Sequence, residues 1–182
     1  MIDEFFIRRE VAKMKSLNGF KYGLIGLALT LFSGLANAAA MTNYLENKLI
    51  DAFLRAQSYT MPATVYVGLY TVCPTDSTAG TEATWGSYAR VAVTSALANW
   101  AGTQSAGSTT ASSGTGGTTS NNGTITFPAA TADWGTVVCF GVSDASTSGN
   151  LLFYAALTAS RNITNGSTAS FAAAALSFQI DN

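Results

Sequence analysis

The sequence contains no histidine, and only 10% of its residues are charged, whereas about 25% is usual in a soluble domain. Without histidine, Ser-His-Asp and Cys-His catalysis and histidine-ligated zinc sites are excluded. The net charge is −1, and the β-rich part of the chain has no basic cluster, which excludes nucleic acid as a partner. Small neutral residues replace the missing charges, a composition typical of extracellular or assembled β proteins.

Cysteine is scarce as well, since the chain has only two. Cys73 ends one predicted strand and Cys139 lies within another, and their spacing matches no metal or redox motif. The two residues form a candidate disulfide if these strands are neighbours. Alternatively, both are small buried apolar side chains.

Residues 1–40 read as an apolar leader that is separate from the rest of the chain. The uncharged run from Gly23 to Ala36 follows several lysines and ends in Ala36-Asn37-Ala38, as in a secretory signal peptide cut after Ala38. Met14 is an alternative start that gives a shorter basic region. A second interpretation is an assembly arm, an uncleaved apolar helix that packs on a neighbouring subunit. The run is shorter than the ~20 residues that span a membrane, and we expect membrane contact only if it is retained.

Residues 41–57 are predicted to form an amphipathic helix from Asn43 to Ala56. Asn43 is the expected N-cap, with Glu46 as its capping-box partner. One face carries apolar side chains at helical spacing, and these are the candidate assembly residues: Leu45, Leu49, Ile50, Phe53 and Leu54. An apolar stripe shows that a face is buried without saying against what. The stripe therefore packs either on its own β-domain or on another subunit.

Residues 58–182 are predicted to form a β-domain. Its centre is the stretch from Trp134 to Thr158, in which two uncharged apolar runs flank a polar turn, as in a β-hairpin. The expected strands are residues 63–72, 88–97, 124–129, 136–142, 151–157 and 169–180. The last contains an alanine run of high helix propensity, but strict alternation at its end favours a strand. Together these elements predict a mainly β fold, an antiparallel β-sandwich, jelly-roll-like, with one N-terminal amphipathic helix.

Two further regions are polar. Residues 102–124, rich in Ser, Gly and Thr, have no apolar anchor and are expected to be a mobile loop or to gain order against a partner. Residues 158–168 are expected to be a polar connection, and Arg90 is expected on the exposed side of its strand.

The residues that could take part in catalysis or glycan binding do not form a recognised motif. The candidate glycosidase carboxylates are Asp76, Glu82, Asp133 and Asp144, and turn or loop roles account for each. The candidate glycan-stacking aromatics are Tyr66, Tyr70, Trp85, Tyr88 and Trp100, although aromatic residues at strand spacing are more often core. We predict no catalytic residue, no cofactor, no metal site and no enzymatic activity.

Several segments, taken in order, resemble a family of small tailed-phage and prophage proteins commonly labelled phage tail fibre or minor virion proteins. The matching segments are residues 43–51, 65–71, 86–90, 125–128, 134–137 and 149–154. Proteins of this kind usually start at the position of Met41 and lack an apolar leader. No catalytic residues are carried over from the resemblance.

The resemblance implies a structural protein on the surface of a phage or phage-like particle, as head decoration or associated with a tail fibre. Its expected partners are other copies of itself, most simply as a trimer, other virion proteins and a host surface glycan. The alternative is a secreted bacterial surface binding module or filament subunit from which residues 1–38 have been removed.

Overall fold

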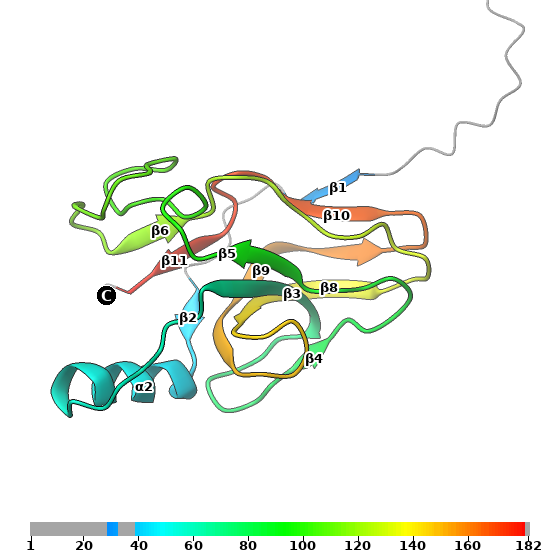
Figure 1. Cartoon of the computed structure of the whole chain (residues 1–182). Coiled ribbons are helices and arrows are strands. Elements are labelled where there is room, and N and C mark those ends of the chain that lie inside the picture. The colour runs from blue at the N-terminus through cyan, green and yellow to red at the C-terminus, as the bar shows by residue number, and fades with distance from the viewer. Residues whose placement is uncertain (1–28, 33–38, 181–182) are drawn as a thin grey trace, which may run out of the picture.

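The computed structural model describes residues 29–32 and 39–180, and these residues are mainly β with a single short helix (Figure 1). This confirms the predicted fold class. The elements are β1 (Leu29–Phe32), β2 (Ala40–Met41), α2 (Asn43–Leu54), β3 (Thr64–Val72), β4 (Thr81–Glu82), β5 (Val91–Thr94), β6 (Thr118–Ser120), β7 (Ile125–Thr126), β8 (Gly135–Ser143), β9 (Leu151–Ile163), β10 (Thr168–Phe171) and β11 (Ser177–Gln179).

The larger layer is a six-stranded antiparallel sheet with the order β2-β9-β8-β3-β4, in which β5 also pairs with β3. β8 and β9 are the predicted hairpin, and β8 lies at the centre between β9 and β3 (Figure 1). Val67 and Leu69 of β3 and Phe140 of β8 have no exposed surface. The uncharged arms of the hairpin thus form the centre of the sheet, as the sequence predicts.

β9 is longer than predicted, because it continues to Ile163 through much of the expected polar connection. Its far end pairs with the start of β8, where Gly135 faces Ile163, and the Trp134 amide donates to the Ile163 carbonyl at 2.9 Å. Ile163 is fully buried. Pairing with β8 therefore overrides the polar composition of this segment.

The second layer consists of two small sheets, β1-β10-β7 and β11-β6. An aromatic core joins the layers, because the Phe140 ring of β8 lies 5.7 Å from Phe171 of β10 and 5.9 Å from Phe178 of β11. Both contacts are edge-to-face, the favoured geometry for aromatic pairs.

The last predicted strand, residues 169–180, is wrong as a continuous element. It divides into β10 and β11, which belong to different sheets, with Ala174 between them in the left-handed region at φ 62°. The cause is Asn121, which is 1% exposed. Its side chain accepts from the Leu176 amide at 2.8 Å and donates to the Ala172 carbonyl at 2.8 Å, so it fixes the turn.

Three other expectations need correction. The strand expected at residues 88–97 is confined to β5, and the one expected at 124–129 is confined to β7. The polar loop 102–124 includes β6 and closes on itself around Gln104. The Gln104 side-chain amide donates to the hydroxyls of Ser108 at 2.6 Å and Thr110 at 2.8 Å. Side-chain hydrogen bonds thus replace the apolar anchor that the tract lacks.

Candidate assembly surface

Helix α2 is fixed to the β-domain at its N-terminal end. The Thr42 amide donates to the Leu152 carbonyl at 3.0 Å, and the Thr42 hydroxyl donates to the Leu151 carbonyl at 2.6 Å. The same hydroxyl accepts from the Leu45 amide at 3.5 Å, so Thr42 is the N-cap. The predicted N-cap, Asn43, is wrong by one residue, because Thr42 is the residue held against β9.

The loop after β3 supports the same end of the helix. The Asp76 carbonyl accepts from the Asn43 amide at 3.3 Å, and the Asp76 carboxylate accepts from the Tyr154 hydroxyl of β9 at 2.5 Å. Hydrogen bonding to Asp76 raises the pKa of Tyr154 from 10.0 to about 12. The first turn of α2 is thereby tied to both β9 and this loop.

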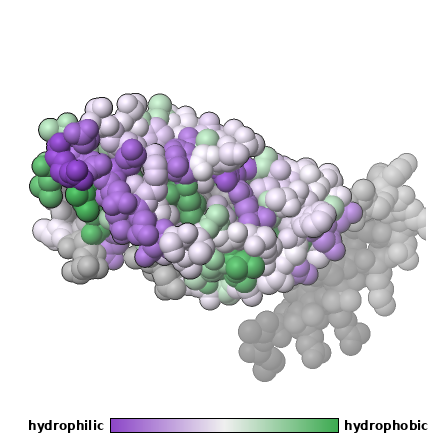
Figure 2. Space-filling model, turned by 90° about the horizontal axis from the view of Figure 1, so that it is seen from below, coloured by the Kyte–Doolittle hydropathy of each residue, from purple (hydrophilic) through white to green (hydrophobic). Residues whose placement is uncertain are grey.

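The remainder of α2 extends away from the sheets (Figure 1). Ile50 is 51% exposed, Phe53 77% and Leu54 81%, and Met61, which follows the helix, is 57% exposed. Figure 2 shows hydrophobic side chains beside hydrophilic ones at the end of the molecule where α2 lies. We call the side chains of Ile50, Phe53 and Leu54 the α2 apolar face.

The five candidate assembly residues thus divide into two groups. Leu45 is buried at 5% exposure and Leu49 is half-buried, whereas the other three form the exposed α2 apolar face. The helix ends at Leu54 rather than Ala56, because the Arg55 and Gln57 amides both bond to the Asp51 carbonyl and Ala56 turns left-handed at φ 53°. The apolar stripe therefore packs on the β-domain at the N-terminal end of the helix and is exposed at the C-terminal end.

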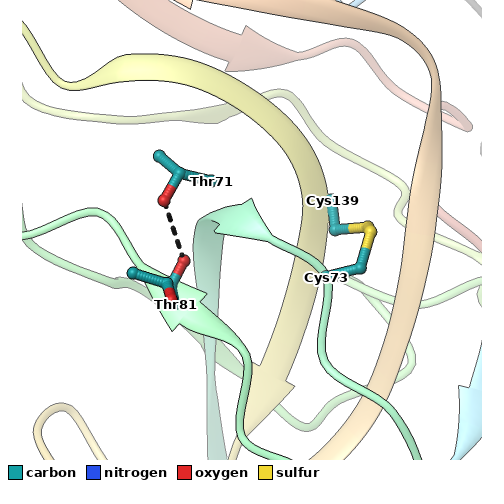
Figure 3. Close-up of a disulfide and its surroundings, with 4 residues drawn as sticks. All are labelled: Thr71, Cys73, Thr81 and Cys139. Atoms are coloured by element: carbon teal, nitrogen blue, oxygen red, sulfur yellow. Dashed lines mark hydrogen bonds between the residues drawn. A yellow bond between two sulfur atoms is a disulfide. The ribbon is translucent and has the colours of Figure 1, made fainter.

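The structure joins Cys73 and Cys139 by a disulfide, with their Cα atoms 5.3 Å apart (Figure 3). Cys73 directly follows β3, and Cys139 is a fully buried residue of β8. Beside it, the Thr71 hydroxyl donates to the Thr81 carbonyl at 3.3 Å and links β3 to β4 (Figure 3). The disulfide fixes the start of the loop that carries Asp76 to β8.

Arg90 is not on an exposed side of its segment, contrary to the sequence prediction. Its guanidinium donates to both carboxylate oxygens of Glu82 at 2.8 Å and to the carbonyls of Ala145 and Ser148 at 2.8 Å. Arg90 and Glu82 side chains are only 11% and 20% exposed. Arg90 thus links Glu82 of β4, through a bidentate ion pair, to the carbonyls of the β8–β9 turn. Glu82 therefore has a structural role.

Tyr88 completes this polar cluster. Its hydroxyl donates to Glu82 at 2.7 Å and accepts from the Leu69 amide at 2.8 Å. Burial raises the pKa of Tyr88 above its usual value, and neighbouring Glu82 adds to the effect. A Cβ at Gly68 would lie 2.7 Å from a Glu82 carboxylate oxygen, so a larger residue here would displace this carboxylate.

The other candidate carboxylates each have a different partner. Asp133 accepts from the Asn165 amide at 2.7 Å, and Asp144 accepts from the Asn150 amide at 2.7 Å. These are bonds within turns and loops, as predicted. Among the described residues, 29–32 and 39–180, no group of three or more His, Cys, Asp or Glu side chains could hold a metal ion.

Most of the candidate stacking aromatics belong to the interior. Tyr70 is 4% exposed, Tyr88 packs edge-on against Trp134 at 5.2 Å, and Trp100 packs on Phe178 at 5.5 Å. Tyr66 is half-buried in β3. Trp85, at 65% exposure, is the one of the five that presents its ring to solvent.

Three features of the structure are not predicted from the sequence: the role of Asn121, the Glu82–Arg90–Tyr88 cluster and strand β1. Asn121 and the Glu82–Arg90–Tyr88 cluster bring together residues from separate segments. Strand β1 lies inside the predicted leader, so the alternative of an apolar helix is wrong for residues 29–32. Residues 1–28 and 33–38, with the proposed cut after Ala38, lie outside the described residues. Within the described part of the chain, no helix is long and apolar enough to cross a membrane.

The candidate carboxylates are thus hydrogen-bonded within the β-domain, and α2 exposes apolar side chains, which together fit a structural or interaction protein. The comparisons make this more specific: residues 40–179 match the family model of the podophage GP4 fiber I protein gp80. The chain belongs to this family of phage fibre structural proteins, which confirms the resemblance drawn from its segments. No curated protein matches it.

Proposed function

We propose that the chain is a non-enzymatic subunit of a phage tail fibre, displayed on the virion surface, which associates with its own copies and with other virion proteins through the α2 apolar face. The single observation that carries this is the exposure of Phe53 and Leu54, at 77% and 81%, on a helix whose other end is fixed by Thr42. Large apolar side chains presented together on a rigid element are typical of an interaction site.

The fixed N-terminal turn suits this role. Thr42 holds the backbone to β9, and Asp76 holds it to the neighbouring loop, so the helix is oriented before it meets a partner. Pre-oriented side chains lose less conformational entropy on association than those on a mobile segment. The β-domain acts as the rigid support, and α2 provides the contact.

The size of the contact favours an oligomer over an isolated pair. Burying a large apolar side chain contributes ~1.5–3 kcal/mol, so Phe53 and Leu54 together contribute roughly 3–6 kcal/mol per subunit. Association costs on the order of 4–15 kcal/mol. Repetition around a symmetry axis multiplies such weak contacts, and we propose a trimer with the three α2 helices around its axis.

Membership in a fibre family favours a tail-fibre position over head decoration. The test is to propagate the phage with Phe53→Lys/Leu54→Lys and to quantify the chain in purified particles by mass spectrometry. The control is Leu97→Lys, which alters another exposed apolar residue, at 55% exposure. We expect loss of the chain from particles for the double variant alone. Equal incorporation of both variants would contradict the proposal. Electron microscopy with a labelled antibody against the chain distinguishes a position on the tail from one on the head.

The alternative, a secreted surface module or filament subunit, is favoured by the disulfide between Cys73 and Cys139, because such bonds persist in oxidising compartments. Exposed Trp85 would be its stacking residue for a glycan. Intact mass of the protein recovered outside cells is the test. A mature N-terminus at Ala39 supports export, while recovery of the chain only with phage particles supports the fibre subunit.

A further inference from the structure

The outer edge of β10 is covered by a strand from the apolar leader. β10 pairs with β7 on one side and with β1 on the other, and the β1 pairing is parallel, with Leu29 opposite Thr168 and Phe32 opposite Phe171. All four residues of β10 are buried. Removal of β1 would leave backbone N–H and C=O groups of this edge without a partner.

Two described parts of the leader, residues 29–32 and Ala39, pair with the C-terminal part of the chain in the same register. At β1 the paired positions are 29 and 168, and at the parallel bridge further along they are 39 and 178. The interval is the same in both places. Residues 29–32 and Ala39 thus pair with residues 168–171 and Phe178 in the same register.

The proposed cleavage point lies beside the second of these contacts. Ala39, the first residue after it, is 2% exposed, and its amide donates to the Ser177 carbonyl at 3.2 Å. Ala40 and Met41 then pair with β9. The backbone directly after the junction is thus bonded to the β-domain, and β1, which precedes the junction, pairs with β10, whereas a signal peptide is separated from the folded domain.

We infer that the outer edge of β10 is an acceptor for an extended strand, that residues 29–32 of the same chain are its occupant, and that the run from Gly23 to Ala36 is retained in the mature protein. The inference is independent of the α2 contact. The leader then has a structural role, because β1 closes an edge of β10 that could otherwise pair with another chain.

The first test uses Thr30→Pro/Leu31→Pro in the full chain. In a parallel pair the amides of alternate residues bond to the same neighbouring strand. One of the two adjacent residues Thr30 and Leu31 therefore donates to β10, and replacing both with proline removes that donor. The control is Leu24→Pro/Ile25→Pro, in the same apolar run but before β1. Amide hydrogen exchange of residues 168–171 is the readout. We expect exchange at least about tenfold faster in the Thr30/Leu31 variant than in the control.

A synthetic peptide of residues 27–34, flanked by lysines for solubility, is then added to the Thr30/Leu31 variant. Restored protection of residues 168–171 supports a strand acceptor. Exchange that is equal in wild type and variant, or unaffected by the peptide, would overturn it. Intact mass of the native protein is a separate check if the variant does not fold: a chain beginning at Ala39 overturns retention, and one that includes residues 29–38 supports it.

Discussion

Phenylalanine and leucine occur in two opposite environments in this protein. In the core, Phe140 and Leu69 have no exposed surface and lie between the two layers, whereas Phe53 and Leu54 on α2 are mostly exposed. The residue types are the same, so the difference lies in whether a packing partner is present. The core has its partners within the chain, and we propose that the α2 apolar face finds its partners on other subunits.

The largest expected effect of a substitution is in the core. Trp134 is 1% exposed and packs on Tyr88 and Phe127, so Trp134→Ala should lower the free energy of unfolding by ~3–5 kcal/mol through the lost contacts and the cavity. Trp85→Ala is the control, because Trp85 is 65% exposed, and it should change little. Urea denaturation measures both, and equal losses would contradict this description of the core.

The disulfide should have the next largest effect. Cys73 and Cys139 are separated by 66 positions, and removal of a disulfide typically costs ~2–4 kcal/mol, because the unfolded chain gains freedom. We expect this loss for Cys73→Ala/Cys139→Ala, measured as a shift in the thermal midpoint. Mass spectrometry of the unreduced, alkylated wild type checks the bond itself: two alkylated cysteines would show that it does not form.

Two ion pairs provide a matched comparison. Arg90→Met leaves the Glu82 carboxylate, 20% exposed, without its cation, and we expect a loss of about 2–3 kcal/mol, below the range for a fully buried pair. Arg55→Met breaks an exposed pair with Asp51, with side-chain exposures of 70% and 35%, and should cost less than ~0.5 kcal/mol. Chemical denaturation of both variants tests this ranking. A larger loss of stability in Arg55→Met than in Arg90→Met would contradict it.

A smaller effect is expected at high pH in the support of α2. The pKa of Tyr154 is raised to about 12 by its hydrogen bond to Asp76, so the protonated hydroxyl is favoured in the folded state. The contribution of this bond is complete below the unfolded pKa of ~10 and is lost as the pH rises through 12. Tyrosinate absorbance should show one group titrating near 12 that is absent in Tyr154→Phe. Identical curves would contradict this assignment.

The sequence predicts features that depend on neighbouring residues. The β8–β9 hairpin is evident because two uncharged runs flank a polar turn, and α2 is evident from its helical spacing of apolar residues. The break between β10 and β11 is not, because it depends on Asn121, 55 positions from Leu176. For the same reason the burial of Arg90 escapes prediction, since its carbonyl partners lie in the β8–β9 turn. Spacing along α2 also cannot show that its apolar stripe is buried at Leu45 and exposed at Phe53 and Leu54.

Substitutions on the α2 apolar face should have the smallest effect on folding. Phe53→Lys/Leu54→Lys removes two exposed side chains, and the free energy of unfolding of the dissociated subunit should change by less than ~0.5 kcal/mol per site. The effect on association should be large, because two lysines per subunit would repel one another at the proposed trimer axis. Leu97→Lys is the control for added charge.

Sedimentation equilibrium of the full-length protein is the most direct measurement. Our account predicts a mass of three subunits for the wild type and for Leu97→Lys, and the mass of one subunit for Phe53→Lys/Leu54→Lys. An oligomer of the same mass in the double variant, or a monomeric wild type at all concentrations, would contradict the role proposed for α2.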